Sequence, residues 1–205
     1  ERMFPNYVAS EAVLASENLH FGQGACDAEA HNACIHTFIR NVVASMDFGG
    51  STLNKHYNKD NEHGTTRRTS DVFALATAVL FQSSVQHFAL APNNLDDAPH
   101  WAVDFMKQVP TQWDEVKFID GYPGRYAAIA RRSGQQWFVA AINAQKEPVK
   151  AKLDLSTFFA KGTTVTAYTD DAQLNGKATQ TKLKSLTFKA EIPENGGMLI
   201  VGPAK

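Results

Sequence analysis

Residues 113–143 read WDEVKFIDGYPGRYAAIARRSGQQWFVAAIN, and they contain three stretches in which apolar and polar residues alternate. This period of two is typical of β-strands, and Tyr-Pro-Gly and Ser-Gly mark the turns between them. Further stretches that read as strands follow at 149–155, 163–170, 184–192 and 197–202. Seven short strands, spaced by about ten residues, predict an antiparallel sandwich of two packed sheets.

The residues before Pro110 have a different pattern, which predicts helices. Three stretches are rich in apolar residues and long enough for a helix, at 10–19, 31–46 and 69–81. Ser10 is a possible N-cap of the first stretch, and Thr69 or Ser70 of the third. The hydroxyl of such a residue can accept a hydrogen bond from a backbone N–H of the first turn.

A short apolar run at 84–90 follows the third stretch, and a further helix is predicted from Asp97, with Pro99 in its first turn. This order of helix, strand, loop and helix is typical of parallel α/β units. One or two such units are too few to close a barrel or to bury both faces of a sheet. We therefore expect the missing units before Glu1 or on another chain.

The distribution of charge separates two domains. The formal net charge of −1 gives no basis for binding to nucleic acids or to anionic membranes, and no apolar run reaches the roughly 18 residues of a membrane span. Residues 1–109 carry a net charge of −5 and all seven histidines, whereas residues 110–205 carry +4. Acid–base or metal chemistry is therefore expected in residues 1–109. Residues 110–205 are expected to fold without residues 1–109.

Two local features of the first part also bear on function. Cys26 and Cys34 are the only cysteines, and we interpret them as buried free thiols, since two cysteines alone do not make a metal site. Residues 48–66 form a long polar stretch without periodicity. A loop of this length is usually functional or mobile, although a solvated excursion without a function is an equally good interpretation.

Two passages resemble a known family. Residues 109–144, VPTQWDEVKFIDGYPGRYAAIARRSGQQWFVAAINA, contain Trp-Asp-Glu, Gly-x-x-Gly-x-Tyr and Arg-Arg-x-Gly-x-x-Trp, and they resemble the start of the carboxy-terminal β domain of glycoside hydrolase family 97. Residues 3–17, MFPNYVASEAVLASE, and 30–48, AHNACIHTFIRNVVASMDF, are similar to the family's Tyr-Pro-Asn, Glu-x(5)-Glu, His-x(5)-Pro-Phe-Thr-Arg and Met-Asp-Tyr passages. The chain departs from the family pattern at Phe4, residues 14–17 and His36.

The resemblance implies a fold and an activity. Such enzymes have an amino-terminal β-sandwich, a central (β/α)8 barrel with the active site, and a small β domain, and they hydrolyse α-glucosides or α-galactosides. The chain would then be the end of the barrel, at 1–109, followed by an antiparallel β-sandwich at 110–205. Its partners would be the preceding part of the same enzyme and an α-linked oligosaccharide. An exported bacterial enzyme, for example in the periplasm, is also implied.

The same resemblance implies roles for individual carboxylates. Glu17 falls on the family's general acid, which also binds calcium, and Glu11 falls on another calcium-binding glutamate. Calcium suits such a site because it prefers several oxygen ligands. Glycoside hydrolysis needs a second carboxyl group, and the family places that group before Glu1. A retaining and an inverting mechanism both stay open.

Taken without the resemblance, these residues have simpler interpretations. Glu11 and Glu17 lie about 240° apart on a straight helix and could both be solvated acids. His31 and Asp47 are candidates for binding substrate hydroxyls, but a lone histidine is more often a structural group. Arg40 is expected to anchor the end of the barrel through a carboxylate or backbone carbonyls.

The competing hypothesis is a non-catalytic carbohydrate-binding or structural β-sandwich. It explains the strands equally well, but not the acidic first part with its histidines. A sugar-binding sandwich should present aromatic side chains on one exposed face, whereas Trp113, Tyr126 and Trp137 lie in or beside the alternating strands. For these tryptophans and for Trp101 we expect packing in the core or at a domain interface.

Overall fold

The structure is a computed structural model. It describes residues 9–10, 22–40, 45–46, 53, 55–56, 63–83, 86–88, 90 and 94–205. Within these ranges no helix is both long enough and apolar enough to cross a membrane.

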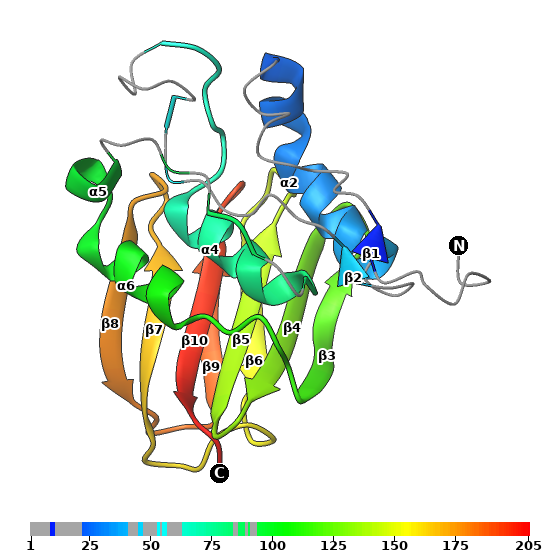
Figure 1. Ribbon diagram of the computed structural model, residues 1–205. Coiled ribbons are helices and arrows are strands. Elements are labelled where there is room, and N and C mark those ends of the chain that lie inside the picture. Colours follow the sequence, from blue (N-terminus) through cyan, green and yellow to red (C-terminus); the bar gives the residue numbers. More distant parts are fainter. Residues whose placement is uncertain are drawn as a thin grey trace.

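Six antiparallel strands form the main sheet, and the alternating pattern predicted all of them except β8 (Gly176–Lys182) (Figure 1). In spatial order they are β3 (Glu115–Tyr122), β4 (Tyr126–Ser133), β5 (Gln136–Asn143), β10 (Gly197–Pro203), β7 (Thr164–Asp170) and β8 (Gly176–Lys182). Strands β6 (Val149–Asp154) and β9 (Thr187–Ile192) pair with each other in a second, two-stranded sheet.

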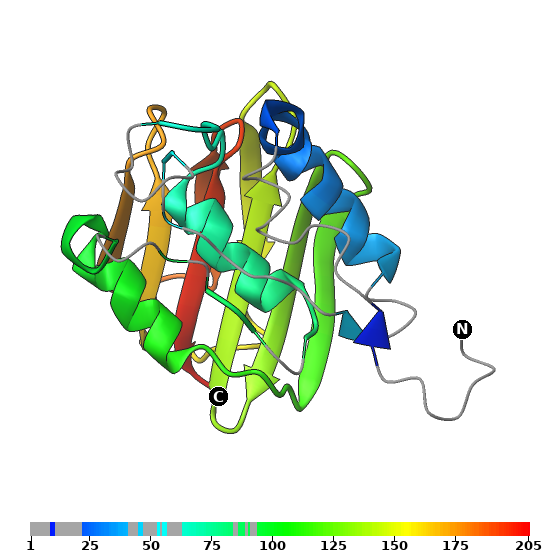
Figure 2. The ribbon, with the colours of Figure 1, turned by 45° about the horizontal axis from the view of Figure 1, so that its top comes forward.

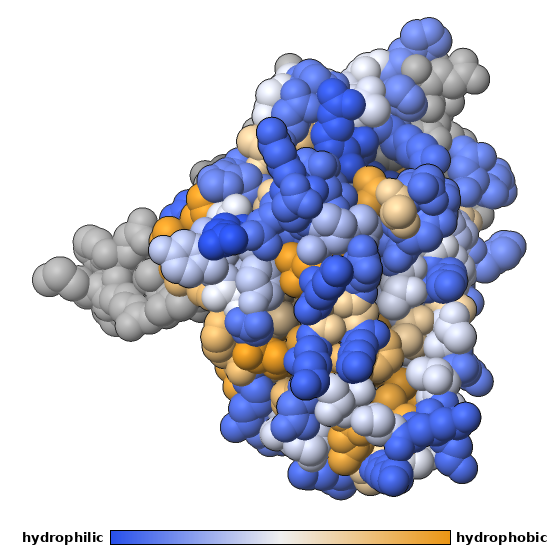
Figure 3. Space-filling view, turned by 180° about the vertical axis from the view of Figure 1, so that it is seen from behind, coloured by the Kyte–Doolittle hydropathy of each residue, from blue (hydrophilic) through white to orange (hydrophobic). Residues whose placement is uncertain are grey.

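The two sheets pack face to face, which confirms the predicted antiparallel sandwich. Ala128, Val139 and Met198 of the main sheet form one buried cluster with Leu153 of β6 and Ile192 of β9. The outer face of the small sheet carries exposed lysines. Figure 3 views the molecule from this side and shows hydrophilic side chains around small hydrophobic areas. The small sheet therefore buries one face and exposes the other.

Strand β8 was not among the seven predicted strands. Its sequence, GKATQTK, is polar, and most of its side chains are at least partly exposed. β8 lies at the edge of the sheet and pairs with β7 alone. An edge strand with solvated side chains has no run of apolar residues, and this explains why the prediction of seven strands was one too few.

Helices cover the other face of the main sheet (Figure 2). Helix α4 (Asp71–Leu80) lies across its centre, and every residue from Val72 to Leu80 is buried. Ser70 is the N-cap of α4, as predicted, because its Oγ accepts a hydrogen bond from Phe73 N at 2.9 Å. Helices α2 (Gln23–Phe38) and α6 (His100–Gln108) lie on either side of α4 (Figure 2).

Three predicted helix boundaries are wrong. Helix α2 begins at Gln23 rather than at residue 31, and the pattern missed its first turns because they carry small and polar residues without an apolar stripe. It ends at Phe38 rather than at residue 46, since Ser45–Met46 form strand β2. Asp97 does not cap α6: it is the last residue of the short helix α5 (Asn94–Asp97), and Pro99 holds the N-cap position of α6. Pro99 cannot donate a backbone hydrogen bond, and it is well tolerated at this end of a helix.

A short parallel pair supports the α/β interpretation of the first part. Strand β1 (Ala9–Ser10) pairs with β2 (Ser45–Met46), and α2 lies between them in the sequence. Parallel neighbours need a crossover connection of this kind. Beyond this pair, the described residues form an antiparallel β domain with a few helices.

Helix α4 contacts the β domain at both ends. At its beginning, Gly197 of β10 lies so close that a Cβ there would be 2.6 Å from Phe73 N, so only glycine fits. At its end, buried Arg131 of β4 donates from Nη2 to Leu80 O at 3.2 Å. Burial lowers the pKa of Arg131 to about 10, but the guanidinium stays charged at neutral pH and faces the negative end of the helix dipole.

The two predicted domains share this core. The larger hydrophobic cluster combines residues of α4, such as Phe73 and Leu75, with Phe138, Ile142 and Leu199 of the sheet. The change from helices to strands falls near the predicted boundary, since α6 ends at Gln108 and β3 begins at Glu115. Independent folding of 110–205 stays a prediction, and it would leave the helix-covered face of the sheet in water.

Cysteines and tryptophans are placed as predicted. Cys26 and Cys34 are both buried and are not joined in a disulfide, and burial raises the pKa of the Cys34 thiol to about 12. Trp137 is buried between the sheets, and Trp101 and Trp113 are half-buried against the helix-side core. None of these three indoles forms an exposed platform.

Helix α2 meets the turn between β3 and β4 through His31. Its Nδ1 lies 3.0 Å from the carbonyl oxygen of Gly124. Gly124 has a φ of +71°, and a Cβ at this position would lie 2.6 Å from His31 Cε1. The glycine is therefore required both by its backbone conformation and by the imidazole ring above it.

A buried carboxylate joins α4 to the sheet. Asp170 Oδ2 accepts hydrogen bonds from Ser70 Oγ at 2.5 Å and from Gly197 N at 2.7 Å. Burial raises the pKa of Asp170 to about 6, and the nearby Asp71 carboxylate adds to the rise, while the two hydrogen bonds oppose it. The folded chain thus holds a proton on Asp170 more tightly than the unfolded chain does.

We expect Asp170 to make stability fall as pH rises from about 4 to 6. The unfolded carboxyl loses its proton near its ordinary pKa of 3.8, whereas the folded one retains it to about 6. The contribution is therefore greatest below the lower value and is lost above the higher one, with an amplitude on the order of 2–3 kcal/mol. The free energy of unfolding, measured with urea across this pH range, should decrease with pH in the wild type and lack this decrease in Asp170→Asn. An identical slope in both proteins would refute the assignment.

Gly124→Ala should lower the free energy of unfolding by about 1–3 kcal/mol, through backbone strain and collision with His31. In a His31→Ala background the same change should be less destabilising, because the collision is removed. Gly134→Ala is the matched control, since Gly134 has a φ of +55° and a Cβ added there would meet no atom within 4 Å. Its effect should be the same with or without His31. If the effects of both glycine substitutions depended equally on His31, this result would contradict the contact between Gly124 and His31.

Candidate functional site

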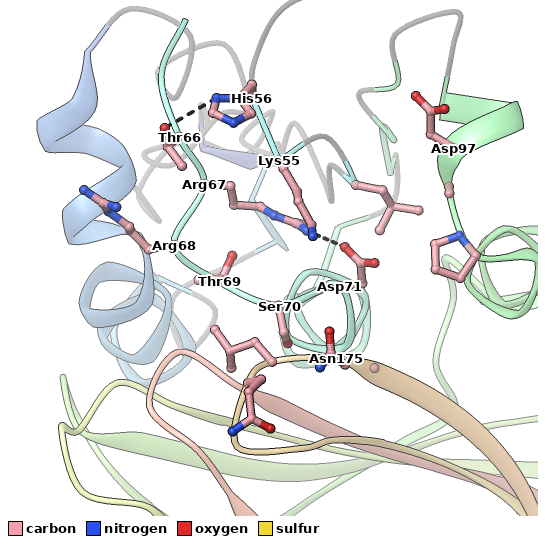
Figure 4. A pocket seen from close by; sticks show the side chains of 16 residues that line it. Lys55, His56, Thr66, Arg67, Arg68, Thr69, Ser70, Asp71, Asp97 and Asn175 are labelled. Carbon is pink, nitrogen blue, oxygen red and sulfur yellow. Dashed lines mark hydrogen bonds and ion pairs between the residues drawn. The ribbon is translucent and has the colours of Figure 1, made fainter. Parts of the chain in front are cut away.

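A cavity of about 470 Å³ opens where three segments meet (Figure 4). One wall is the connection that leads from β2 to α4, with Lys55, His56 and residues 66–71. The second is the approach to α6 at residues 97–99, and the third is the turn between β7 and β8 at residues 173–176. The β domain and the helical part therefore both line this cavity.

The connection from β2 to α4 closes on itself at the cavity. His56 and Thr66 form an antiparallel bridge, and Arg67 N donates to Lys55 O at 2.8 Å. The side chain of Gln23, in the first turn of α2, donates to Thr66 O and accepts from Thr66 N, at 2.9 and 2.8 Å. Residues 55–56 are thereby held against residues 66–67, and Thr66 is tied to α2.

Each of residues 67–70 is held by an ion pair or a hydrogen bond of its side chain. Arg67 forms a partly buried ion pair with Asp71, and Arg68 pairs with Asp27 at 2.8 Å. Thr69 Oγ1 donates to Glu29 Oε2 at 2.9 Å. Ser70 continues the series with its hydrogen bond to Asp170, and Ser70 N donates to Asn195 O at 3.0 Å. The segment is therefore fixed to α2 on one side and to the β domain on the other.

Charges along this segment are largely neutralised in pairs. The side chain of Arg67 is only 3% exposed and that of Asp71 19%, so this pair lies at the floor of the cavity. Glu29 is buried, and burial raises the pKa of its carboxyl, although the Arg67 guanidinium opposes the rise. Lys55 points from the cavity wall toward the Arg67–Asp71 pair (Figure 4).

Three predicted site residues, Glu11, Glu17 and Asp47, lie outside the described part of the chain. The structure does describe the strands that precede two of them. β1 ends at Ser10 and β2 at Met46, and these two residues are partners in the parallel pair. Glu11 and Asp47 are the next residues in the sequence after these strands.

His31 is the one predicted site residue whose surroundings are described. It is exposed on α2, and one ring nitrogen contacts the β3–β4 turn. Its role in substrate binding stays a prediction. Nearby, His36 is buried, and neither of its ring nitrogens has a hydrogen-bond partner within the described ranges. Burial and the Arg40 guanidinium both lower the pKa of His36, so its ring is neutral at neutral pH.

The sequence analysis missed the residues that line the cavity. TTRRTSD at 65–71 was interpreted only as the end of a loop and the cap of a helix. The carboxylates of Asp27 and Glu29 are partners of this segment, with Arg68 and Thr69 respectively. Two adjacent arginines before a helix cap are a local signal for such pairing, but their partners lie far away in the sequence.

Comparison with known proteins connects this architecture to a family. Residues 112–201 match the family model described as glycosyl-hydrolase 97 C-terminal, oligomerisation. The probable retaining alpha-galactosidase of Streptomyces bingchenggensis is 34% identical over 107 residues, which are 52% of this chain and 16% of that protein. The retaining alpha-galactosidase of Bacteroides thetaiotaomicron is 29% identical over 149 residues, 69% of this chain and 22% of that protein. The chain thus spans less than a quarter of either relative's length.

Solved structures extend the similarity into the helical part. The crystal structure of a β-arabinopyranosidase is 57% identical with a TM-score of 0.90, over 98% of this chain and 32% of that one. A glycoside hydrolase family 97 enzyme from Pseudoalteromonas sp. strain K8, in complex with acarbose, has the same fold, with a TM-score of 0.71 at 21% identity over 90% of this chain and 31% of that one. The chain therefore belongs to glycoside hydrolase family 97 and contains the C-terminal β domain of that family.

Proposed function

We propose that the chain is part of an exo-acting glycoside hydrolase, in which it supplies the last units of a (β/α)8 barrel and the β domain behind them. The parallel pair β1–β2, with α2 between its strands, carries this proposal. In such barrels the chemistry takes place on the loops that follow the carboxyl ends of the strands. Glu11 and Asp47 occupy these positions in the sequence.

Glu17 is proposed as the general acid. It follows β1 on the same connection as Glu11 and would protonate the oxygen of the departing group while the glycosidic bond breaks. Asp47, after β2, and His31 are proposed to bind substrate hydroxyls. The opposite carboxyl group would come from the part of the enzyme outside this chain, so the stereochemical outcome is not assigned.

Calcium is proposed as the metal of this site, with Glu11 and Glu17 among its ligands. Carboxylate oxygens are the ligands that calcium prefers, and two of them provide only part of the six to eight oxygens it usually binds. Within the described ranges there is no group of three or more His, Cys, Asp or Glu side chains that could hold a metal. The ion would supply positive charge beside the carboxylates, and the remaining ligands would come from other parts of the enzyme.

The substrate is proposed to be a pyranoside of galacto configuration. Both curated relatives are named as alpha-galactosidases, and the structure with 57% identity is named as a β-arabinopyranosidase. β-L-Arabinopyranose has the ring configuration of α-D-galactopyranose and lacks only its hydroxymethyl group. These relatives favour an α-galactoside or a β-L-arabinopyranoside over an α-glucoside. An exported location, such as the periplasm, is proposed from the family resemblance alone.

A non-catalytic sugar-binding sandwich is the second candidate. It would need an exposed aromatic platform, but Trp137 and Phe138 are buried and Trp113 packs edge-on against Phe138 at 5.3 Å. Of the exposed rings on β3, Phe118 packs edge-on against Phe38 of α2 at 5.9 Å, which leaves Tyr122 as the other exposed ring of that strand.

The isolated 205-residue chain should not hydrolyse glycosides. Its opposite catalytic carboxyl group and most of the barrel would be missing, so the acid would have no partner across the bond. Nitrophenyl α-galactoside and nitrophenyl β-L-arabinopyranoside are suitable substrates for this assay. Turnover at an enzyme-like rate that disappears in Glu17→Gln would contradict the proposed division of the site.

In the longer enzyme, Glu17→Gln should slow the hydrolysis of natural oligosaccharides by several orders of magnitude and that of nitrophenyl glycosides far less. An acid matters most when the departing oxygen is basic, and a nitrophenolate leaves with little help. Glutamine retains the shape of the side chain but has no acidic proton. Calcium content must be measured in parallel, because losing a ligand could itself disturb the site. An equal loss on both substrates with calcium retained would favour a positioning role for Glu17.

A further inference from the structure

The cavity between residues 55–56 with 66–71, 97–99 and 173–176 has a defined position relative to the proposed barrel. Its first wall belongs to the connection from β2 to α4, and its second joins α5 to α6. Connections from a strand into the next helix lie on the catalytic side of a barrel. The third wall comes from the β domain (Figure 4). The cavity is thus a place where the β domain adds to this side of the barrel.

The charges around the cavity argue against a strongly anionic ligand. Arg67 and Arg68 are already paired with Asp71 and Asp27. Asp71 also occupies the first turn of α4, so a carboxylate already lies where the helix dipole would attract an anion. A phosphate bound here would meet this carboxylate directly.

A metal ion fits the cavity no better. The basic side chains of Lys55, Arg67 and Arg68 line it, and the described ranges contain no group of metal-binding side chains. An apolar ligand is disfavoured as well. Such ligands need a mainly hydrophobic lining with only a few polar groups, whereas most residues around this cavity are polar or charged.

A neutral ligand with many hydroxyl groups fits the lining best. Lys55 can only donate hydrogen bonds, Asp97 can only accept them when ionised, and Gln173 can do both. Sugar hydroxyls both donate and accept. The volume of about 470 Å³ lies within the range of roughly 300–1,000 Å³ found for small-molecule sites.

The cavity wall is also preorganised. Residues 66–70 are each held by hydrogen bonds or ion pairs to α2, to Asp71 or to the β domain, and the turn at 173–176 is braced by Asp171, whose carboxylate accepts from Gln173 N and Asn175 N at 2.9 Å. A site that is already ordered loses less entropy when a ligand binds. This rigidity distinguishes the cavity from an accidental gap between loops.

We propose that this cavity binds a neutral saccharide unit of the substrate, away from the carboxylates that cleave the glycosidic bond. Lys55, Asp97 and Gln173 are the side chains that recognise its hydroxyls, over a floor formed by the Arg67–Asp71 pair. The proposal rests on the proposed hydrolase function for the identity of its ligand. It makes the β domain a part of substrate recognition.

The test is a binding titration of the ¹⁵N-labelled 205-residue chain with raffinose, a neutral trisaccharide that contains an α-galactosyl unit. Amide resonances of residues 66–71 and 173–176 should shift in a saturable manner. Lys55→Gln should weaken the apparent Kd several-fold. Lys184→Gln, which removes an exposed lysine after β8, at the far end of that strand from the cavity, should leave the Kd unchanged.

Three outcomes would overturn the proposal. These are the absence of shifts at the cavity amides, equal weakening by both lysine variants, and saturable shifts with inorganic phosphate but none with raffinose. If Lys55→Gln loses the dispersed spectrum of the folded chain, Gln173→Ala at the opposite wall replaces it. The titration measures binding and does not depend on hydrolysis. A longer enzyme without activity would refute the proposed function, and the titration would still decide whether this chain binds a saccharide.

Discussion

The attachment of α4 to the β domain is the constraint on which the rest of the structure depends. The helix lies on the centre of a six-stranded sheet, is buried over nearly its whole length, and is joined to the sheet at both ends. Its first turn touches the backbone of Gly197, where no side chain has room. The cavity wall at 66–70 leads directly into this helix, and its last residue, Ser70, is held to the sheet by the hydrogen bond to Asp170.

The main sheet is buried on both faces, which is uncommon for antiparallel strands. Its central strands, β5 and β10, are therefore almost entirely buried, although the residues alternate between two different cores. One core faces the helices and the other faces β6 and β9. The sheet thus serves as the common middle layer of two packings. The core that faces β6 and β9 is built from residues of the β domain alone, whereas the core that faces the helices is shared with the first part of the chain.

Much of the fold could be predicted from local patterns. Alternation within 113–143 predicted three strands because each turn between them is marked by proline or glycine. Ser70 was predicted as a cap because capping depends only on neighbouring residues. The cavity could not be predicted in this way, since Thr69 and Ser70 find their partners 40 and 100 residues away. The proposed catalytic carboxylates came from family resemblance, because spacing alone places Glu11 and Glu17 on different sides of a helix.

Strand β8 shows that a sheet can end in a way that leaves little trace in the sequence. Its outer edge carries backbone N–H and C=O groups that no further strand of this sheet takes up. A flat, apolar strand at such a place would be a template for joining another molecule edge to edge. The lysines, threonines and glutamine of β8 keep water at this edge. The polarity that concealed the strand from pattern analysis therefore disfavours association with another molecule at this edge of the sheet.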